Sequence, residues 1–204
     1  MTKRNRYDKN SECLYRGELA EKEFEIIAKN VYNLIVIPAT KKQQKLDKFD
    51  FICKSRKTNK SYKIEVKAEK KYKRKHKNVS ENWLWIEFKG ISGYEGWLYG
   101  KSDFIAFEKG NEFWIIKRKL LLQIAENLID LSEKALNSKS SQYKGYRRKQ
   151  RPHELIAQIK YSDIEKYCKK WQKTLDYYRL FSKKSTECIY YDSKFYFYCF
   201  SRFW

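Results

Sequence analysis

Apolar positions recur along this chain with two different periods. From Gly17 onward they fall three and four residues apart, which predicts an amphipathic helix. The residues of this stripe are Ala20, Phe24, Ile27, Ala28 and Val31. Shorter apolar or alternating runs predict strands at residues 34–38, 49–54, 61–68, 83–89, 103–108, 112–116 and 154–161, and residues 97–99 are expected to continue the strand interrupted by a glycine-rich turn.

The remaining segments complete an alternation of helices and strands. A long helix is expected over residues 117–137, and a further helix from Ser162 towards Trp171, with polar loops at 39–48, 69–82 and 138–152. This order predicts an α/β fold in which helices flank a mixed β-sheet. The 204 residues suit one well-buried domain. We expect a loose arm at 1–16, the domain at 17–168 and an aromatic-rich extension at 169–204.

The chain carries a strong positive charge, which is unevenly distributed. Its 46 Lys and Arg residues against 25 Asp and Glu residues give a formal net charge of +21. Residues 54–77 hold 12 basic and 2 acidic residues, and residues 139–184 hold 14 and 4. An AT-rich genome or a hot habitat could contribute to the lysine content, but neither explains the clustering. Nucleic acid is therefore the expected partner.

Cysteine usage and hydropathy exclude several classes. The five cysteines form no C-x-x-C pair and only His76 and His153 accompany them, so a zinc finger is not expected. An odd cysteine count without an apolar leader favours a reducing, cytoplasmic location. No apolar stretch approaches the length needed to cross a bilayer, so no membrane span and no membrane partner are expected, although a basic face could touch anionic lipid.

Three residues from neighbouring predicted strands could carry chemistry. In the run 61–68, Glu65 and Lys67 alternate with apolar residues and so share one face, and Asp50 begins the preceding strand. An acid at the start of one strand of a hairpin and an acid across from it can share a metal. Phosphodiester hydrolysis uses hard divalent cations, which prefer carboxylate oxygens. The pattern therefore predicts a metal site.

The same residues resemble the motif of the PD-(D/E)XK nuclease superfamily, specifically archaeal Holliday junction resolvases and related viral and phage nucleases. The matching order is Gly17-x-x-x-Glu21, a strand ending in Pro38, then Asp50, then Glu65-Val66-Lys67. The segments Asn82-Trp83-Leu84-Trp85-Ile86-Glu87, Gly96-Trp97-Leu98 and Lys101-Ser102-Asp103-Phe104 resemble the strand and glycine-containing segment that come after the site in phage and viral members. Phe49 precedes Asp50 where the family name expects proline.

The resemblance implies a restriction-endonuclease-like core and a set of roles. Asp50 and Glu65 would bind Mg²⁺ or Mn²⁺ together with the main-chain carbonyl of Val66. Lys67 would orient the attacking water or neutralise the transition state, and Glu21 would act from the helix. The implied activity is that of a homodimeric, metal-dependent DNA endonuclease in viral or mobile-element replication or recombination, which could act on junctions or single strands.

Other interpretations of the acids remain open. Acid-x-Lys arises easily in so lysine-rich a chain, and both Glu69-Lys70-Lys71 and Glu87-Phe88-Lys89 also match it. Asp47 is an alternative ligand to Asp50. The three residues could instead form a solvated, salt-bridged sheet face, and Glu21 could be a surface carboxylate. In that case the chain would be a basic nucleic-acid-binding protein without catalytic activity.

Two basic segments are expected to contact DNA phosphates, although both could instead be solvated surface. They comprise Lys70, Lys71, Lys73, Arg74 and Lys75 after the catalytic strand, and Arg147, Arg148, Lys149 and Arg151 in the later loop. The C-terminal aromatic residues could stack on bases or form a packing or dimer surface.

Overall fold

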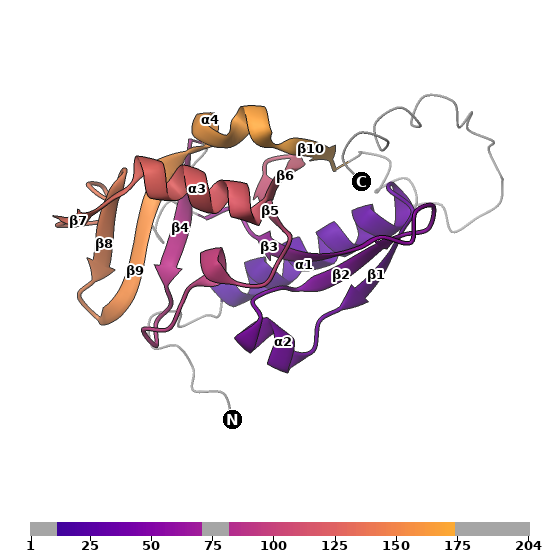
Figure 1. Ribbon diagram of the computed structural model, residues 1–204, viewed down its shortest axis with the longest axis horizontal. Helices are drawn as coiled ribbons and strands as arrows, with labels where there is room; N and C mark the ends of the chain where they lie inside the picture. Colours follow the sequence, from indigo (N-terminus) through magenta and orange to yellow (C-terminus); the bar gives the residue numbers. More distant parts are fainter. Residues whose placement is uncertain (1–11, 71–81, 174–204) are drawn as a thin grey trace.

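The chain folds into two β-sheets with helices packed against them, as the computed structural model of residues 12–70 and 82–173 shows (Figure 1). In chain order the elements are α1 (Glu12–Asn30), β1 (Leu34–Pro38), α2 (Lys41–Leu46), β2 (Phe51–Ser55), β3 (Ser61–Lys67), β4 (Trp83–Lys89), the 3-10 helix η1 (Trp97–Tyr99), β5 (Phe104–Lys109), β6 (Glu112–Lys117), α3 (Arg118–Leu128), β7 (Asp130–Ala135), β8 (Lys144–Arg148), β9 (Arg151–Lys160), α4 (Tyr161–Ile164), the 3-10 helix η2 (Glu165–Tyr167) and β10 (Lys169–Gln172). Six strands pair in the order β1-β2-β3-β5-β6-β10, and four in the order β4-β9-β8-β7. Each sheet contains one parallel pair of strands, and its other pairs are antiparallel. The parallel pair is β3 and β5 in the six-stranded sheet, and β7 and β8 in the four-stranded sheet. The predicted α/β class with a mixed sheet is confirmed.

Helix α1 covers one face of the six-stranded sheet through the predicted apolar stripe. Ala20, Phe24, Ile27 and Ala28 are all buried against β1, β2 and β3. Phe24 is fully buried, and its ring centre lies 5.4 Å from that of Phe113 in an edge-to-face contact. Burial of one such ring contributes about 1.5–3 kcal/mol. This layer fixes α1 beside β3, the strand that carries Glu65 and Lys67.

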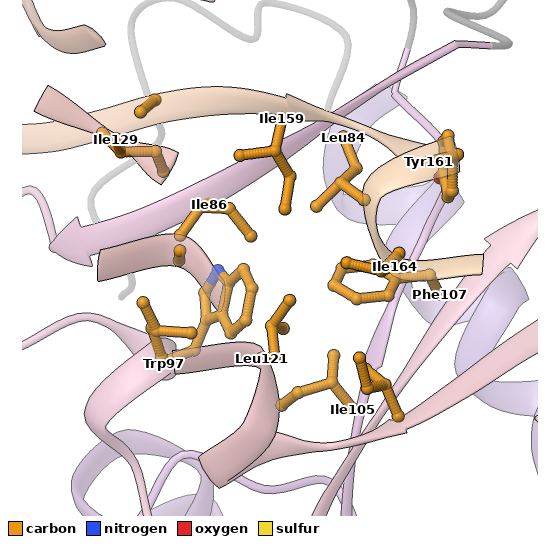
Figure 2. Close-up of a cluster of buried hydrophobic side chains, with 14 of the residues drawn as sticks. Leu84, Ile86, Trp97, Ile105, Phe107, Leu121, Ile129, Ile159, Tyr161 and Ile164 are labelled. Carbon is orange, nitrogen blue, oxygen red and sulfur yellow. The ribbon is translucent and has the colours of Figure 1, made fainter. Parts of the chain in front are cut away.

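The second core lies between the two sheets and is closed by α3, η1 and α4. Leu84, Ile86 and Ile159 point into it from the four-stranded sheet, while Ile105 and Phe107 come from β5 (Figure 2). The β3–β5 register places Glu65 beside Ile105 and Lys67 beside Phe107. Glu65 and Lys67 therefore lie on the face of the six-stranded sheet that looks towards this core, whereas Ile64 and Val66 pack under α1.

Strand β10 joins the six-stranded sheet although it lies in the segment expected to be an extension. It pairs with β6, and Trp171 is buried, with its ring centre 5.5 Å from that of Phe24 and 4.0 Å from that of Tyr32. At the other end, α1 begins at Glu12, inside the segment expected to be an arm. The remaining aromatic residues of the extension, 174–204, lie outside the described residues.

Several element predictions were wrong. Residues 39–48 contain helix α2, and residues 97–99 form η1 instead of a strand. The helix expected over 117–137 ends at Leu128, after which β7 begins, and the loop expected at 138–152 contains β8. The helix expected towards Trp171 is only α4 and η2.

No helix among the described residues has the length and apolar character required to cross a membrane.

Candidate functional site

Asp50 is fixed at the point where β2 begins beside the end of β3. The β2–β3 register pairs Phe51 with Ile64, which sets Asp50 level with Glu65. The backbone N–H of Asp50 donates to the Ile64 carbonyl at 2.8 Å, and the Val66 N–H donates to Asp50 Oδ2 at 2.8 Å. Asp50 is 9% exposed and Glu65 is 6% exposed. The hairpin thus buries two carboxylates at the same level of adjacent strands.

Lys67 shares its face of β3 with Glu65 and forms an ion pair with it. The ammonium Nζ of Lys67 donates to Glu65 Oε1. The same Nζ lies 5.4 Å from the centre of the Trp97 ring on η1. The Lys67 side chain is therefore held between a carboxylate and an aromatic face, and only about a quarter of its surface is exposed.

The charges of these groups affect one another strongly. Burial, and next the negative charge of Glu65, raise the pKa of Asp50 to about 7. Lys67 and the Val66 N–H oppose this rise. Burial lowers the pKa of Lys67, but Glu65 and Asp50 outweigh that effect, so the Lys67 pKa lies above its ordinary value. The two acids therefore disfavour each other's charge, and Lys67 offsets part of that repulsion.

Glu21 comes close to the same cluster from α1. Its side chain is partly buried, and burial is the main reason that its pKa is raised. Lys67 lowers this pKa and Glu65 raises it, so both lie within electrostatic range of Glu21. The structure therefore brings together Glu21, Asp50, Glu65 and Lys67.

Helix α2 supplies a contact that the sequence patterns did not predict. Gln44 Nε2 donates to Asp50 Oδ1 at 3.5 Å. The helix is started by Thr40, whose side chain accepts from the Gln43 N–H at 3.3 Å while Gln43 Oε1 accepts from the Thr40 N–H at 2.9 Å. This reciprocal cap, Thr40-x-x-Gln43, is visible in the sequence and could have revealed α2.

The alternative acids are engaged elsewhere. Asp47 pairs with Lys101 at 2.7 Å, and this hydrogen bond lowers the pKa of Asp47. Glu69 accepts from the Gly110 N–H at 3.4 Å, in the turn between β5 and β6. Glu87 lies on β4 on the face opposite the buried Leu84, Ile86 and Phe88, although its charge still acts on Lys67. Asp50 and Glu65 are therefore the better candidates for a shared ligand.

The donor chemistry fits a hard divalent cation. Among the described residues, no three or more His, Cys, Asp and Glu side chains are arranged to hold a metal ion, so side chains alone do not complete a site. Asp50 and Glu65 offer carboxylate oxygens. Because the N–H and C=O groups of a strand residue point to the same side, the Val66 carbonyl faces the side on which Asp50 accepts the Val66 N–H. These three oxygen sources are the ligand type that Mg²⁺ and Mn²⁺ use.

A cleft opens directly beside Lys67. It encloses about 300 Å³, a figure that includes the open solvent at its mouth. Its walls are Lys67, Ala68, Lys70, Trp83, Leu84, Trp85, Phe107 and Tyr161. The cleft therefore joins the end of β3 to the start of β4, which belongs to the other sheet.

Some of the described residues that were predicted to contact DNA have exposed side chains, whereas others contact groups within the protein. Lys70 and Lys149 are exposed. Arg148 and Arg151 each lie 3.4 Å from the carboxylate of Glu154, which is 3% exposed. The guanidinium of Arg147 donates to the Pro152 carbonyl at 3.3 Å. Lys71, Lys73, Arg74 and Lys75 lie outside the described residues.

Comparisons of the chain with protein-family models, with curated proteins and with solved structures find no match. The chemistry of the site must therefore be inferred from its own side chains and from the motif order in the sequence.

Proposed function

We propose that this protein is a metal-dependent nuclease that hydrolyses DNA phosphodiester bonds, built on a restriction-endonuclease-like core of the PD-(D/E)XK type. The observation that supports this most is the burial of Asp50 and Glu65 side by side with Lys67. Burying two negative charges side by side is energetically unfavourable unless a cation offsets their repulsion. The net charge of +21 agrees with a polyanionic substrate.

Each group has a role in the proposed reaction. Asp50, Glu65 and the Val66 carbonyl would hold Mg²⁺ or Mn²⁺, which supplies an activated water and offsets charge on the phosphate. Lys67, held beside Glu65, would orient that water or stabilise the charge that develops on phosphate oxygens. The oxygen of the attacking water would bond to phosphorus as the bond from phosphorus to the leaving oxygen breaks. The proton that the water loses would balance the one that the leaving oxygen gains from solvent. Glu21 assists from α1.

One observation favours a second candidate, a basic nucleic-acid-binding protein without catalytic activity. Glu65 already has Lys67 as a partner, and Glu154 has Arg148 and Arg151, so the buried acids could serve only to balance nearby cations. Both candidates bind DNA in a salt-sensitive way. Only the nuclease needs a divalent metal for its activity.

The deciding experiment measures cutting and binding on the same protein. Purified full-length chain should nick or cut labelled DNA with Mg²⁺ or Mn²⁺ and stop in EDTA. Glu65→Gln and Lys67→Met should each reduce the rate by a hundredfold or more, in the range found when one transition-state contact is removed, and should leave DNA binding in EDTA largely intact. Glu69→Gln and Glu87→Gln are the matched controls.

Two outcomes would contradict the proposal. Equal damage from Glu69→Gln would show that the site is misplaced. Strong binding with no metal-dependent cutting on any substrate would favour the binding protein.

The proposal also includes a homodimer, as in the resolvases that the motifs resemble. Light scattering of the purified protein tests the oligomeric state directly.

A further inference from the structure

The outer face of the four-stranded sheet carries a row of aromatic rings. The ring centres of Trp85 and Tyr146 lie 6.4 Å apart, and the ring centre of Trp83 lies 5.6 Å from that of Tyr143, which itself packs against the core between the sheets. Trp83 and Trp85 come from β4, and Tyr146 comes from β8, with β9 between them. The rings therefore reach across β9 and form one surface.

This surface faces away from the core. Leu84 and Ile86, which alternate with the two tryptophans on β4, point into the core between the sheets (Figure 2). On β9, the residues opposite the tryptophans are Lys160 for Trp83 and Gln158 for Trp85. Gln158 is 2% exposed beneath the rings, whereas Trp83, Trp85 and Tyr146 are partly exposed. The rings thus cover β9 and still present area to solvent.

Positive charge borders the rings. Lys160 Nζ lies 5.5 Å from the centre of the Trp83 ring. Arg148 lies two residues after Tyr146 at the end of β8, and Lys70 lies within electrostatic range of Arg148. Partly exposed aromatic rings with cations at their border are the kind of surface that binds single-stranded nucleic acid, because unpaired bases stack on the rings while the backbone follows the charges.

The cleft connects this face to the candidate catalytic lysine. Trp83 and Trp85 line the same cleft as Lys67 and Lys70. The aromatic face and Lys67 therefore border the same cleft. Stacked duplex cannot use the rings in this way, because its bases are already stacked on one another.

We propose that the face formed by Trp83, Trp85 and Tyr146 binds an unpaired stretch of the substrate and leads it to Lys67, so that the preferred substrate contains single-stranded nucleic acid. This deepens the proposed nuclease function and rests on it for the position of the cut. Binding to the face itself needs no metal.

The test compares single-stranded and duplex binding without metal. Full-length protein in EDTA at fixed salt is titrated into a labelled oligothymidylate and into a labelled duplex, with fluorescence anisotropy as the readout. Trp85→Ala should weaken single-strand binding about tenfold and duplex binding less than twofold, and Trp85→Phe should retain most of the single-strand affinity. Tyr167→Ala, at an exposed aromatic residue on η2, is the matched control and should change neither affinity.

The outcomes separate this inference from the nuclease proposal. Equal weakening of both ligands by Trp85→Ala, or no weakening of either, overturns the single-strand face. Circular dichroism shows whether Trp85→Ala folds, and if it does not, the folded Trp85→Phe protein decides. Equal loss of affinity for the single strand and the duplex in Trp85→Phe overturns the single-strand face. Retained affinity with a preference for the single strand supports it. Loss of single-strand affinity in a protein that never cuts with Mg²⁺ supports the face and overturns the nuclease.

Discussion

At the scale of single residues, Asp50 is expected to make the metal-free protein less stable as the pH rises. The pKa of Asp50 is raised to about 7 from a usual value of 3.8, first by burial and then by Glu65. Between these two values the folded protein keeps a proton that the unfolded chain has released, so stability falls as the pH rises through this window and the full penalty applies above pH 7. The penalty is on the order of a few kcal/mol.

Asp50→Asn should therefore stabilise the metal-free protein at pH 8 far more than at pH 4. The asparagine keeps an oxygen that can accept the Val66 N–H, but it carries no charge to bury. Urea unfolding in EDTA at the two pH values measures the difference. Mg²⁺ should stabilise the original chain and not the variant.

A matched substitution checks the cause. Asp103 accepts a hydrogen bond from the backbone N–H of Lys63, on β3, at 2.8 Å, but its side chain is exposed. Asp103→Asn should therefore show no pH-dependent gain in stability. Equal stabilisation by Asp50→Asn at both pH values would mean that the Asp50 carboxylate carries no burial penalty.

At the scale of elements, two glycines that both belong to the motif resemblance should respond oppositely to alanine. A Cβ at Gly96 would lie 2.2 Å from the Glu87 carbonyl oxygen, because the turn after β4 folds back onto that strand. Gly96→Ala should cost about 1–3 kcal/mol or more, since backbone must shift. At Gly17, inside α1, a Cβ would meet nothing within 4 Å, and Gly17→Ala should add roughly 0.5–1 kcal/mol.

Chemical denaturation of both variants measures these changes in the free energy of unfolding. A neutral Gly96→Ala would show that the approach of the turn to Glu87 is loose. A destabilising Gly17→Ala would show that this position has a partner that the helix geometry does not reveal.

The elements also show how far the sequence could predict the fold. Strands β1 and β4 were expected from short apolar or alternating runs, and the alternation in β3 placed Glu65 and Lys67 on one face. The helix expected over 117–137 fails because Asp130 Oδ1 accepts the Ser132 N–H at 2.8 Å and so supports a local turn that competes with the helix. The spacing of apolar residues alone does not reveal that a local turn competes with the helix.

The aromatic face and the cleft lay beyond local patterns for a different reason. They depend on β4 leaving the sheet of β3 to pair with β9, and on β8 lying next to β9 in that second sheet. Trp85 and Tyr146 are far apart in the sequence, and only long-range pairing brings their rings to 6.4 Å. Periodicity identifies which face a residue occupies but not which strand becomes its neighbour.

At the scale of the whole molecule, the net charge of +21 predicts DNA binding that weakens steeply with salt. The predicted contact set includes both Lys149, which is exposed, and Arg151, whose side chain is 13% exposed and lies 3.4 Å from Glu154. The two residues should therefore serve different purposes. Lys149 is available to a phosphate, whereas Arg151 compensates a buried carboxylate.

Lys149→Ala should weaken duplex binding and reduce the slope of log affinity against log salt by about 0.9, the value for one phosphate contact, while leaving the melting temperature unchanged. Arg151→Ala should instead lower the free energy of unfolding by about 1–3 kcal/mol, because Glu154 loses one of its charged partners. Anisotropy titrations across a salt series and thermal unfolding measure the two effects on the same preparations. A reversed result, with Lys149→Ala destabilising the fold and Arg151→Ala changing only the salt slope, would mean that DNA meets the β8–β9 hairpin from the side on which Arg151 and Glu154 lie.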